Sequence, residues 1–157
     1  MLLLKNLAYT IIVPSTVAIY VPWSLVSDQP ANTGIWLFLS SALFVLGGAV
    51  YSWCLWDFAT AGLGTPAPFD APKHLVVQGL YHYTRNPMYG GVLTIICGWI
   101  ALFPSLPLLL YGLSVGFSCH LLVLLYEEPH LQKAFGAPYD EYRTHVGRWV
   151  PIINKER

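Results

Sequence analysis

The chain has 157 residues, of which 55% are hydrophobic, 15% aromatic and only 10% charged. Soluble domains carry about 25% charged residues, so this composition lies far outside that norm and indicates a membrane protein. The formal net charge is zero, and without a basic patch the sequence argues against nucleic-acid binding. The length is enough for a single domain over residues 1–157.

The apolar segments predict an all-α, polytopic membrane fold with four transmembrane helices. A spanning helix needs about 20 predominantly apolar residues, and the predicted spans are residues 7–26, 35–56, 88–103 and 106–126. The third is short, about 24 Å at 1.5 Å per residue. Because only a tight break at 103–107 separates the last two spans, we expect them to form a helical hairpin.

The first span could be mistaken for a signal peptide. Pro14 and Pro22 interrupt it, however, and no convincing cleavage site follows, so we expect a retained span. Each proline removes a backbone donor, which predicts kinks at both positions.

The basic residues predict the orientation of the spans. The turns at 27–34 and 103–106 contain no Lys or Arg, whereas the 57–87 loop and the C-terminal tail contain most of them. Cytoplasmic loops carry the excess of basic residues, so four spans place both termini on the cytoplasmic side. Residues 127–147 predict a cytoplasmic surface helix that Gly136 and Pro138 break midway.

Two polar clusters lie at the ends of predicted spans. Arg85 precedes the third span, with several tyrosines around it, while Glu127 and Glu128 follow the fourth. A cation at the edge of a membrane segment usually has a polar partner and a function. The arginine suits a carboxylate or phosphate, and the glutamates suit an ammonium or the arginine itself. Alternatively, Arg85 only reaches back to the interface and the glutamates are solvated charges.

Two motifs in this region resemble those of a known family of integral-membrane enzymes. The first runs from Leu75-Val76-Val77-Gln78-Gly79-Leu80-Tyr81 to Arg85-Asn86-Pro87-Met88-Tyr89-x-Gly91. The second comprises Glu127-Glu128, Leu131, Phe135-Gly136, Tyr139, Tyr142, Val146 and Pro151. Together they are similar to the patterns of the isoprenylcysteine carboxyl methyltransferase and phospholipid methyltransferase group, over roughly residues 60–153.

The resemblance implies an S-adenosylmethionine-dependent methyltransferase that acts on a lipophilic acceptor at the cytoplasmic face of the lipid bilayer. The first two spans (1–58) would precede a cofactor-binding catalytic core (59–157), with the pocket at the cytoplasmic ends of the last two spans. Arg85 and Glu127 would then be catalytic, and His120, Val123 and Glu128 would lie on the acceptor side. The residues expected to line the cofactor are Lys73, His74, Leu75, Val76, Tyr81, Asn86, Pro87, Met88, Tyr89 and Glu127.

The chain departs from the family pattern at two positions. Asn86 stands where many members have histidine, and asparagine cannot titrate, so no acid–base role can belong to it. Val123 stands where eukaryotic isoprenylcysteine enzymes have an arginine, which weakens the case for a prenylcysteine carboxylate as the acceptor.

The acceptor therefore stays open among a prenylcysteine carboxylate, a phospholipid headgroup amine and a small lipophilic thiol, phenol or amine. An amine would need a base, for which His82, His120 and Glu128 are available. A non-catalytic membrane binding module is the alternative from a different class. The three cysteines have no metal-ligand spacing, and we expect no metal and no disulfide.

Overall fold

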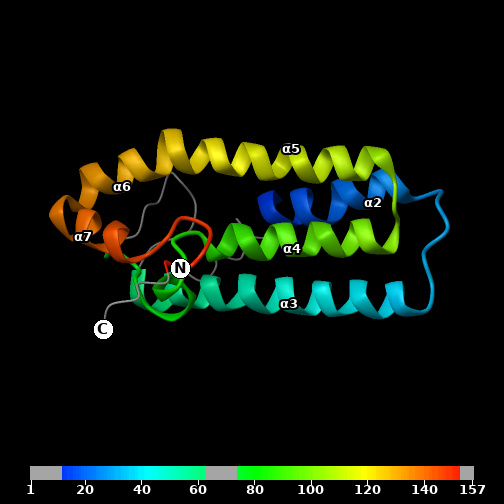
Figure 1. Cartoon of the computed structure of the whole chain (residues 1–157), viewed down its shortest axis with the longest axis horizontal. Helices are drawn as coiled ribbons and strands as arrows, with labels where there is room; N and C mark the ends of the chain where they lie inside the picture. Colours follow the sequence, from blue (N-terminus) through cyan, green and yellow to red (C-terminus); the bar gives the residue numbers. More distant parts are fainter. Residues whose placement is uncertain (1–11, 63–73, 153–157) are drawn as a thin grey trace.

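The computed structural model describes residues 12–62 and 74–152. Helices dominate these two ranges, which contain no β-strand beyond one isolated bridge between Thr84 and Gly147. The predicted all-α class is confirmed. The long helices run side by side, and α6, α7 and the last described residues gather at one end (Figure 1).

The helices begin close to the predicted positions. In chain order the elements are η1 (Thr16–Tyr20), α2 (Val21–Val26), α3 (Ile35–Asp57), η2 (Phe58–Gly62), η3 (Gly79–His82), α4 (Pro87–Leu102), α5 (Leu106–Leu122), η4 (Val123–Glu127), α6 (Glu128–Phe135) and α7 (Ala137–His145). Of these, η1, η2 and η4 are π-helical turns and η3 is a 3-10 turn.

The predicted fourth span, residues 106–126, is part of a longer helical segment, Leu106–Phe135. Helix α5 continues through η4 into α6 and ends only at Phe135, because the π turn accommodates Pro129, which has no N–H to donate. The N–H of Glu128 bonds to the carbonyl of Val123, five residues back. The expected break at Gly136 is confirmed: this residue has φ +59° and separates α6 from α7.

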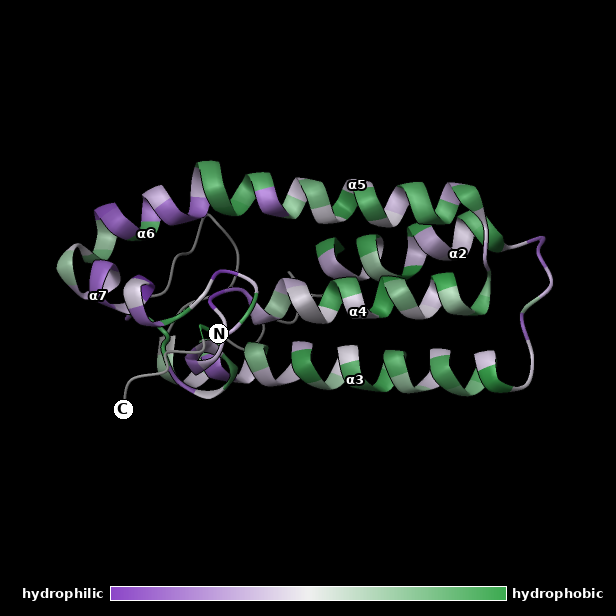
Figure 2. Cartoon of the chain, in the orientation of Figure 1, coloured by the Kyte–Doolittle hydropathy of each residue, from purple (hydrophilic) through white to green (hydrophobic). Residues whose placement is uncertain are grey.

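Two helical segments of the described chain are long and apolar enough to cross a membrane, Ile35–Ala61 and Leu106–Phe135. Two others, Ile12–Val26 and Pro87–Leu102, are apolar but shorter. The outer surfaces of α3 and α5 expose large apolar side chains such as Phe38 and Phe117. Hydrophobic residues follow the long helices, and hydrophilic residues collect around α6 and α7 (Figure 2). This distribution is typical of a membrane protein.

Glycine residues allow α3 and α4 to pack closely. A Cβ atom on Gly47 would lie 2.7 Å from the carbonyl oxygen of Gly91, and one on Gly98 would lie 2.9 Å from the Phe44 ring. Small residues at such positions let backbones approach, which favours helix association in membranes. This contact is the most extensive between two helices of the described chain.

The first helix is bound to its neighbours where Pro22 interrupts its hydrogen bonding. In η1 the N–H of Val21 bonds to Thr16, and Pro22 has no N–H, so the carbonyls of Val17 and Ala18 need other donors. The Tyr111 hydroxyl donates to the Val17 carbonyl at 2.7 Å, and the Trp99 indole donates to the Ala18 carbonyl at 2.9 Å. The kink expected at Pro22 is therefore a π turn, and side chains of α4 and α5 donate hydrogen bonds to its free carbonyls.

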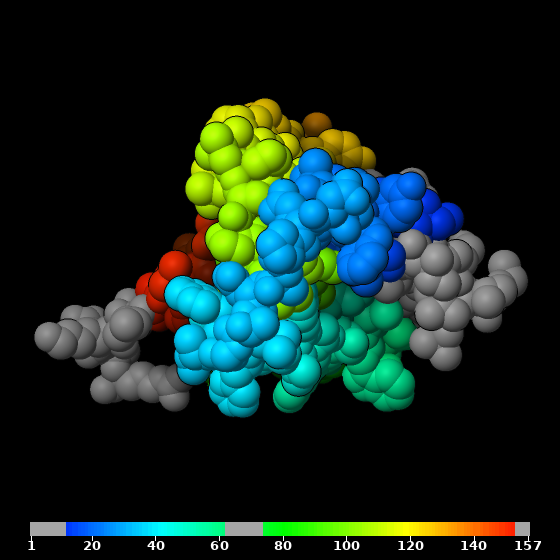
Figure 3. Space-filling model, turned by 90° about the vertical axis from the view of Figure 1, so that its right-hand side faces the viewer, coloured from blue at the N-terminus to red at the C-terminus, as the bar shows by residue number. Residues whose placement is uncertain are grey.

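The end of the molecule away from α6 and α7 is closed by the turn between α2 and α3. The Asn32 N–H bonds to the Leu102 carbonyl at 2.8 Å, and its side chain bonds to the Ala101 carbonyl at 3.1 Å, which satisfies the C-terminal end of α4. Seen from this end, α2 and the turn lie between α3 and α5 (Figure 3).

Candidate functional site

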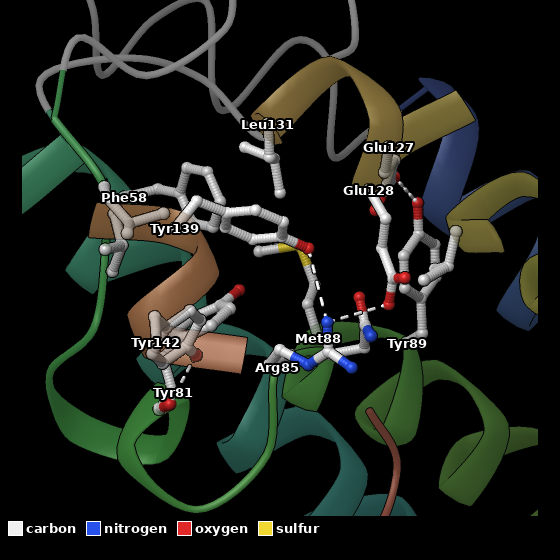
Figure 4. A pocket seen from close by; sticks show the side chains of 14 residues that line it. Phe58, Tyr81, Arg85, Met88, Tyr89, Glu127, Glu128, Leu131, Tyr139 and Tyr142 are labelled. Atoms are coloured by element: carbon white, nitrogen blue, oxygen red, sulfur yellow. Dashed lines mark hydrogen bonds and ion pairs between the residues drawn. The ribbon is translucent and has the colours of Figure 1, made fainter. Parts of the chain in front are cut away.

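A cavity lies where the start of α4, the η4–α6 junction and α7 come together (Figure 4). Its volume is about 100 Å³ by the space open to the centre of a water molecule, and about 700 Å³ when all unfilled space out to solvent is counted. Small-molecule pockets span roughly 300–1,000 Å³. Side chains in the cavity must therefore move apart for a ligand of nucleoside size.

Most of the predicted site residues line this cavity. They are Leu75, Val76, Tyr81, Arg85, Asn86, Met88, Tyr89, Val123, Glu127 and Glu128. The helical hairpin thus brings together the two polar clusters that the sequence separates by about forty residues. Their functional roles stay predictions.

The start of α4 positions the first cluster. Asn86 is the N-cap and Pro87 the first helical residue, where its missing N–H costs nothing. Arg85 precedes the helix, and its N–H bonds to the Gly147 carbonyl at 2.9 Å. Met88 and Tyr89 occupy the first turn of α4 and face the cavity.

Glu128 is bound by two arginines. Arg148 donates from Nε and Nη2 to the two carboxylate oxygens, at 2.7 and 2.8 Å. Arg85 Nη1 lies 2.9 Å from Oε1 of the same carboxylate and 3.4 Å from the Tyr139 hydroxyl. The Arg85 and Glu128 side chains are each only 12% exposed. We call these three residues the arginine–glutamate triad.

Glu127 has a different partner, although it is adjacent in sequence. The Tyr89 hydroxyl donates to its Oε1 atom (Figure 4). No ion pair among the described residues includes Glu127, whereas three include an arginine with Glu128 or Asp140. The two neighbouring carboxylates therefore sit in distinct electrostatic settings, one beside a hydroxyl and one between two cations.

Three tyrosines close the cavity on the side of α7. The Tyr142 hydroxyl donates to the Tyr81 carbonyl at 2.6 Å, which connects α7 to η3. Burial raises the pKa of the Tyr81 hydroxyl well above its usual range, and it also raises the pKa of Tyr139 and Tyr142. All three hydroxyls remain protonated at neutral pH, and that of Tyr139 accepts a hydrogen bond from Arg85 Nη1.

Residues 146–149, which we call the C-terminal strap, run beside the segment before α4. The Arg148 carbonyl accepts from the Thr84 hydroxyl at 3.0 Å and from the Asn86 side chain at 3.1 Å. Together with the bond from Arg85 to Gly147, these contacts fix the strap against the start of α4. The strap is what brings Arg148 to the triad.

Three of the predicted site residues that the structure describes, His74, Pro87 and His120, do not line the cavity. Lys73 lies outside the described residues, His74 is exposed, and Pro87 is buried at the start of α4. His120 instead contacts the strap: the Trp149 indole donates to its Nδ1 at 3.1 Å. Because indole nitrogen can only donate, the proton of the neutral His120 ring is on Nε2.

The prediction also missed residues that belong to the site. Phe58, Leu131, Tyr139 and Tyr142 line the cavity, and Arg148 reaches Glu128. The spacing of Tyr139 and Tyr142, three residues apart on one helix face, was a usable signal. Nothing in the sequence around Arg148 indicates its partner.

The cavity suits a ligand with an aromatic base and a zwitterionic amino-acid group. Phe58, Val76, Met88 and Leu131 offer apolar surface for a ring. Arg85 Nε is buried and has no hydrogen-bond partner, so the triad retains a donor for an anionic group. Glu127 offers a carboxylate for a cationic group. S-adenosylmethionine has these features, so the residues present fit it.

The comparison with known families agrees with this arrangement. The family model described as phospholipid methyltransferase matches residues 35–138, which is 104 of the 157 residues. No curated protein and no solved structure matches the chain. Because the match runs from the start of α3 into α7 and includes the hairpin and both acidic residues, the chain belongs to the phospholipid methyltransferase family, within the group of membrane methyltransferases that also contains the isoprenylcysteine carboxyl methyltransferases.

Proposed function

We propose that this protein transfers the methyl group of S-adenosylmethionine to a lipophilic acceptor at the cytoplasmic face of a membrane. The observation that carries the proposal is the cavity in which Arg85, Glu127 and Glu128 converge at the polar end of the apolar helices. Family membership supplies the reaction class, and the side chains of the cavity support the cofactor.

The cofactor, when bound, supplies an electrophilic methyl group with a neutral thioether as leaving group. The chain's own residues then have mainly a positioning task, because aligning two reactants replaces a bimolecular encounter with a local one. The triad would hold the carboxylate of the amino-acid end. Glu127, whose carboxylate accepts a hydrogen bond from the Tyr89 hydroxyl, would stabilise the positively charged ammonium of the same amino-acid end.

The acceptor decides whether a base is needed. A thiolate or carboxylate needs none, whereas an ammonium must lose a proton first. Glu128 suits this role poorly, because two arginines occupy its oxygens. The lone pair of His120 is on Nδ1 and accepts from Trp149, so His120 could take up a proton only after losing that contact, and His82 is exposed in η3. An amine acceptor would therefore have to react in its uncharged form.

We also propose four spans in a single domain, with both termini cytoplasmic. The four described basic residues, Arg85, Lys133, Arg143 and Arg148, belong to the end that carries the cavity. The turn between α2 and α3 and the break before α5 contain none. Cytoplasmic loops carry the excess of Lys and Arg, so this asymmetry supports the orientation.

Two measurements test the proposed function. Calorimetry with S-adenosylhomocysteine on the detergent-solubilised protein should show saturable binding without any acceptor, because the polar end of the helices opens to water. Transfer of a labelled methyl group to a panel of lipophilic acceptors should then identify the substrate. A chain that binds the cofactor product but methylates no acceptor would instead be the non-catalytic binding module.

The acceptor panel also tests the significance of Val123. This side chain is 1% exposed, lines the cavity and supplies no cation. A free carboxylate on the acceptor should therefore add little affinity, and neutral or amine-bearing lipophiles should compete well. Strong, selective methylation of prenylcysteine carboxylates would contradict this expectation.

A further inference from the structure

The triad contains two cations and one anion. Arg85 and Glu128 line the cavity and are each only 12% exposed, and Arg148, which is 29% exposed, contacts Glu128 from the strap. Arg85 and Arg148 contribute a charge of +2, and Glu128 contributes −1, so the net charge is +1. An unbalanced charge in such a place is costly unless an opposite charge joins it. The buried, unpartnered Nε of Arg85 is a donor that such an anion could use.

Arg148 makes the better pair with Glu128. Its two N–H groups meet the two carboxylate oxygens at 2.7 and 2.8 Å, the parallel fork geometry that makes arginine–carboxylate pairs strong. Arg85 reaches only one oxygen, which it shares with Arg148. Glu128 would thus keep a partner if Arg85 turned toward a ligand.

We propose that Arg148 is a positioning residue that neutralises Glu128 and thereby leaves the charge of Arg85 available for the carboxylate of the cofactor. Without Arg148, Glu128 and Arg85 form a neutral one-to-one pair and the subsite has no net positive charge. With Arg148, the subsite has charge +1, and Glu127 provides a separate negative charge. This separation matches the carboxylate and the ammonium of an amino acid.

The inference rests on the proposed function and adds a residue that the family match does not include. The matched segment ends at residue 138, whereas the strap spans residues 146–149. The strap is fixed by its own contacts to Thr84, Arg85 and Asn86, so it can deliver Arg148 independently of ligand.

Calorimetry with two ligands tests the inference. S-adenosylhomocysteine carries the amino-acid carboxylate, and methylthioadenosine lacks the whole amino-acid group. Arg148→Ala should weaken binding of the first at least about tenfold, as expected for a charge-assisted contact, and leave binding of the second unchanged. Arg85→Gln should show the same pattern.

A double variant separates this electrostatic effect from damage to the fold. In Arg148→Ala with Glu128→Gln, the remaining charge is Arg85 alone, again +1, so affinity for S-adenosylhomocysteine should recover to near the wild-type value. Arg143→Ala is the matched control, because Arg143 is an exposed arginine on α7 whose ion pair with Asp140 is long, at 3.9 Å.

The outcomes are distinguishable. If the wild-type chain shows no saturable binding of S-adenosylhomocysteine, the proposed function fails and this inference fails with it. If the wild type binds but Arg148→Ala binds equally well, only the inference is overturned. Equal weakening for both ligands, or a double variant that does not recover, shows that the strap has a structural role only and also overturns it.

Discussion

Glu127 and Glu128 are neighbours in the chain, yet their side chains have different partners. Glu127 accepts from the Tyr89 hydroxyl, whereas Glu128 is held by Arg85 and Arg148. The π turn η4 ends at Glu127, and α6 begins at Glu128. A π turn adds one residue to a helical turn and changes which side chains share a face. The two adjacent carboxylates are thereby directed to different partners.

At this scale we expect Arg85→Ala and Glu127→Ala each to lower turnover by at least about a hundredfold, as removal of a key electrostatic contact does. Both side chains line the cavity, and neither change removes apolar surface from the helices. Labelled methyl transfer measures activity, and membrane fractionation confirms insertion, with Arg143→Ala as the control. Near wild-type turnover in both variants would show that the site assignment is wrong.

The buried tyrosines predict a loss of stability in alkali. Burial raises the pKa of Tyr142 and Tyr81 above the ordinary tyrosine value of about 10, so the folded chain holds these protons more tightly than the unfolded chain. Their stabilising effect is complete below that ordinary value and is lost as the pH rises toward the folded pKa. The midpoint temperature of thermal unfolding in detergent should fall less steeply as the pH rises in Tyr142→Phe than in wild type. Identical slopes would contradict this.

At the scale of the elements, glycines and prolines decide how the helices pack. Gly47 and Gly91 bring α3 and α4 into backbone contact, and Pro22 frees two carbonyls that Trp99 and Tyr111 satisfy. These contacts matter in a membrane, because lipid offers no hydrogen bonds and no hydrophobic driving force between helices. The rigid α3–α4 pair then supports the start of α4, where the site is built.

Two adjacent glycines of α3 allow a matched test of this packing. A Cβ on Gly47 would lie 2.7 Å from both the Gly91 carbonyl and the Ile95 side chain, whereas one on Gly48 has nothing within 4 Å. Gly47→Ala should destabilise the protein by about 1–3 kcal/mol through overpacking. Gly48→Ala should be neutral or stabilising by up to about 1 kcal/mol through helix propensity.

Unfolding of both variants in the same detergent measures this difference. Because the two substitutions change the helix propensity equally, the comparison isolates the contact between α3 and α4. Equal midpoints for Gly47→Ala and Gly48→Ala would mean that the helices are not as close as described.

At the scale of the whole molecule, charge and hydropathy divide the protein along its length. The apolar helices occupy one part, and α6 and α7, with hydrophilic residues around them, occupy one end (Figure 2). The cavity lies at that end, and so do the described basic residues, which are in or beside α6, α7 and the cavity. Under the proposed function, a water-soluble cofactor would reach that end directly, and an acceptor dissolved in lipid would approach from the side of the helices. The two reactants would thus meet at the boundary between water and bilayer.

Cysteine labelling in sealed vesicles tests the orientation. Asp28 is exposed in the turn after α2 and is a better probe than Ser105, whose hydroxyl is buried. In a background without native cysteines, Asp28→Cys should react with an impermeant maleimide only from the non-cytoplasmic side. Lys133→Cys on α6 should react only from the cytoplasmic side, and labelling of Asp28→Cys from that side would refute the proposed topology.

The starts of the helices and the polar end of the molecule could be predicted from the amino-acid sequence. Apolar runs bounded by Pro and Gly mark the starts of α3, α4 and α5, and the break at Gly136 follows from one residue. These features depend on local backbone chemistry and on composition. The two motifs also identified most of the residues that line the cavity, because a hairpin with a short break necessarily returns its outer ends to the same side.

The contacts between side chains within the site depend on tertiary packing and could not be predicted from the sequence. Arg148 lies twenty residues from Glu128, and their contact depends on how the strap folds back over α4. Trp99 of α4 and Tyr111 of α5 donate hydrogen bonds to the carbonyls that Pro22 leaves free on another helix. The continuation of α5 past residue 126 into α6 has a related cause, since a π turn can absorb a proline that ordinarily ends a helix. Such outcomes depend on which groups remain unsatisfied after packing, and no local pattern contains that information.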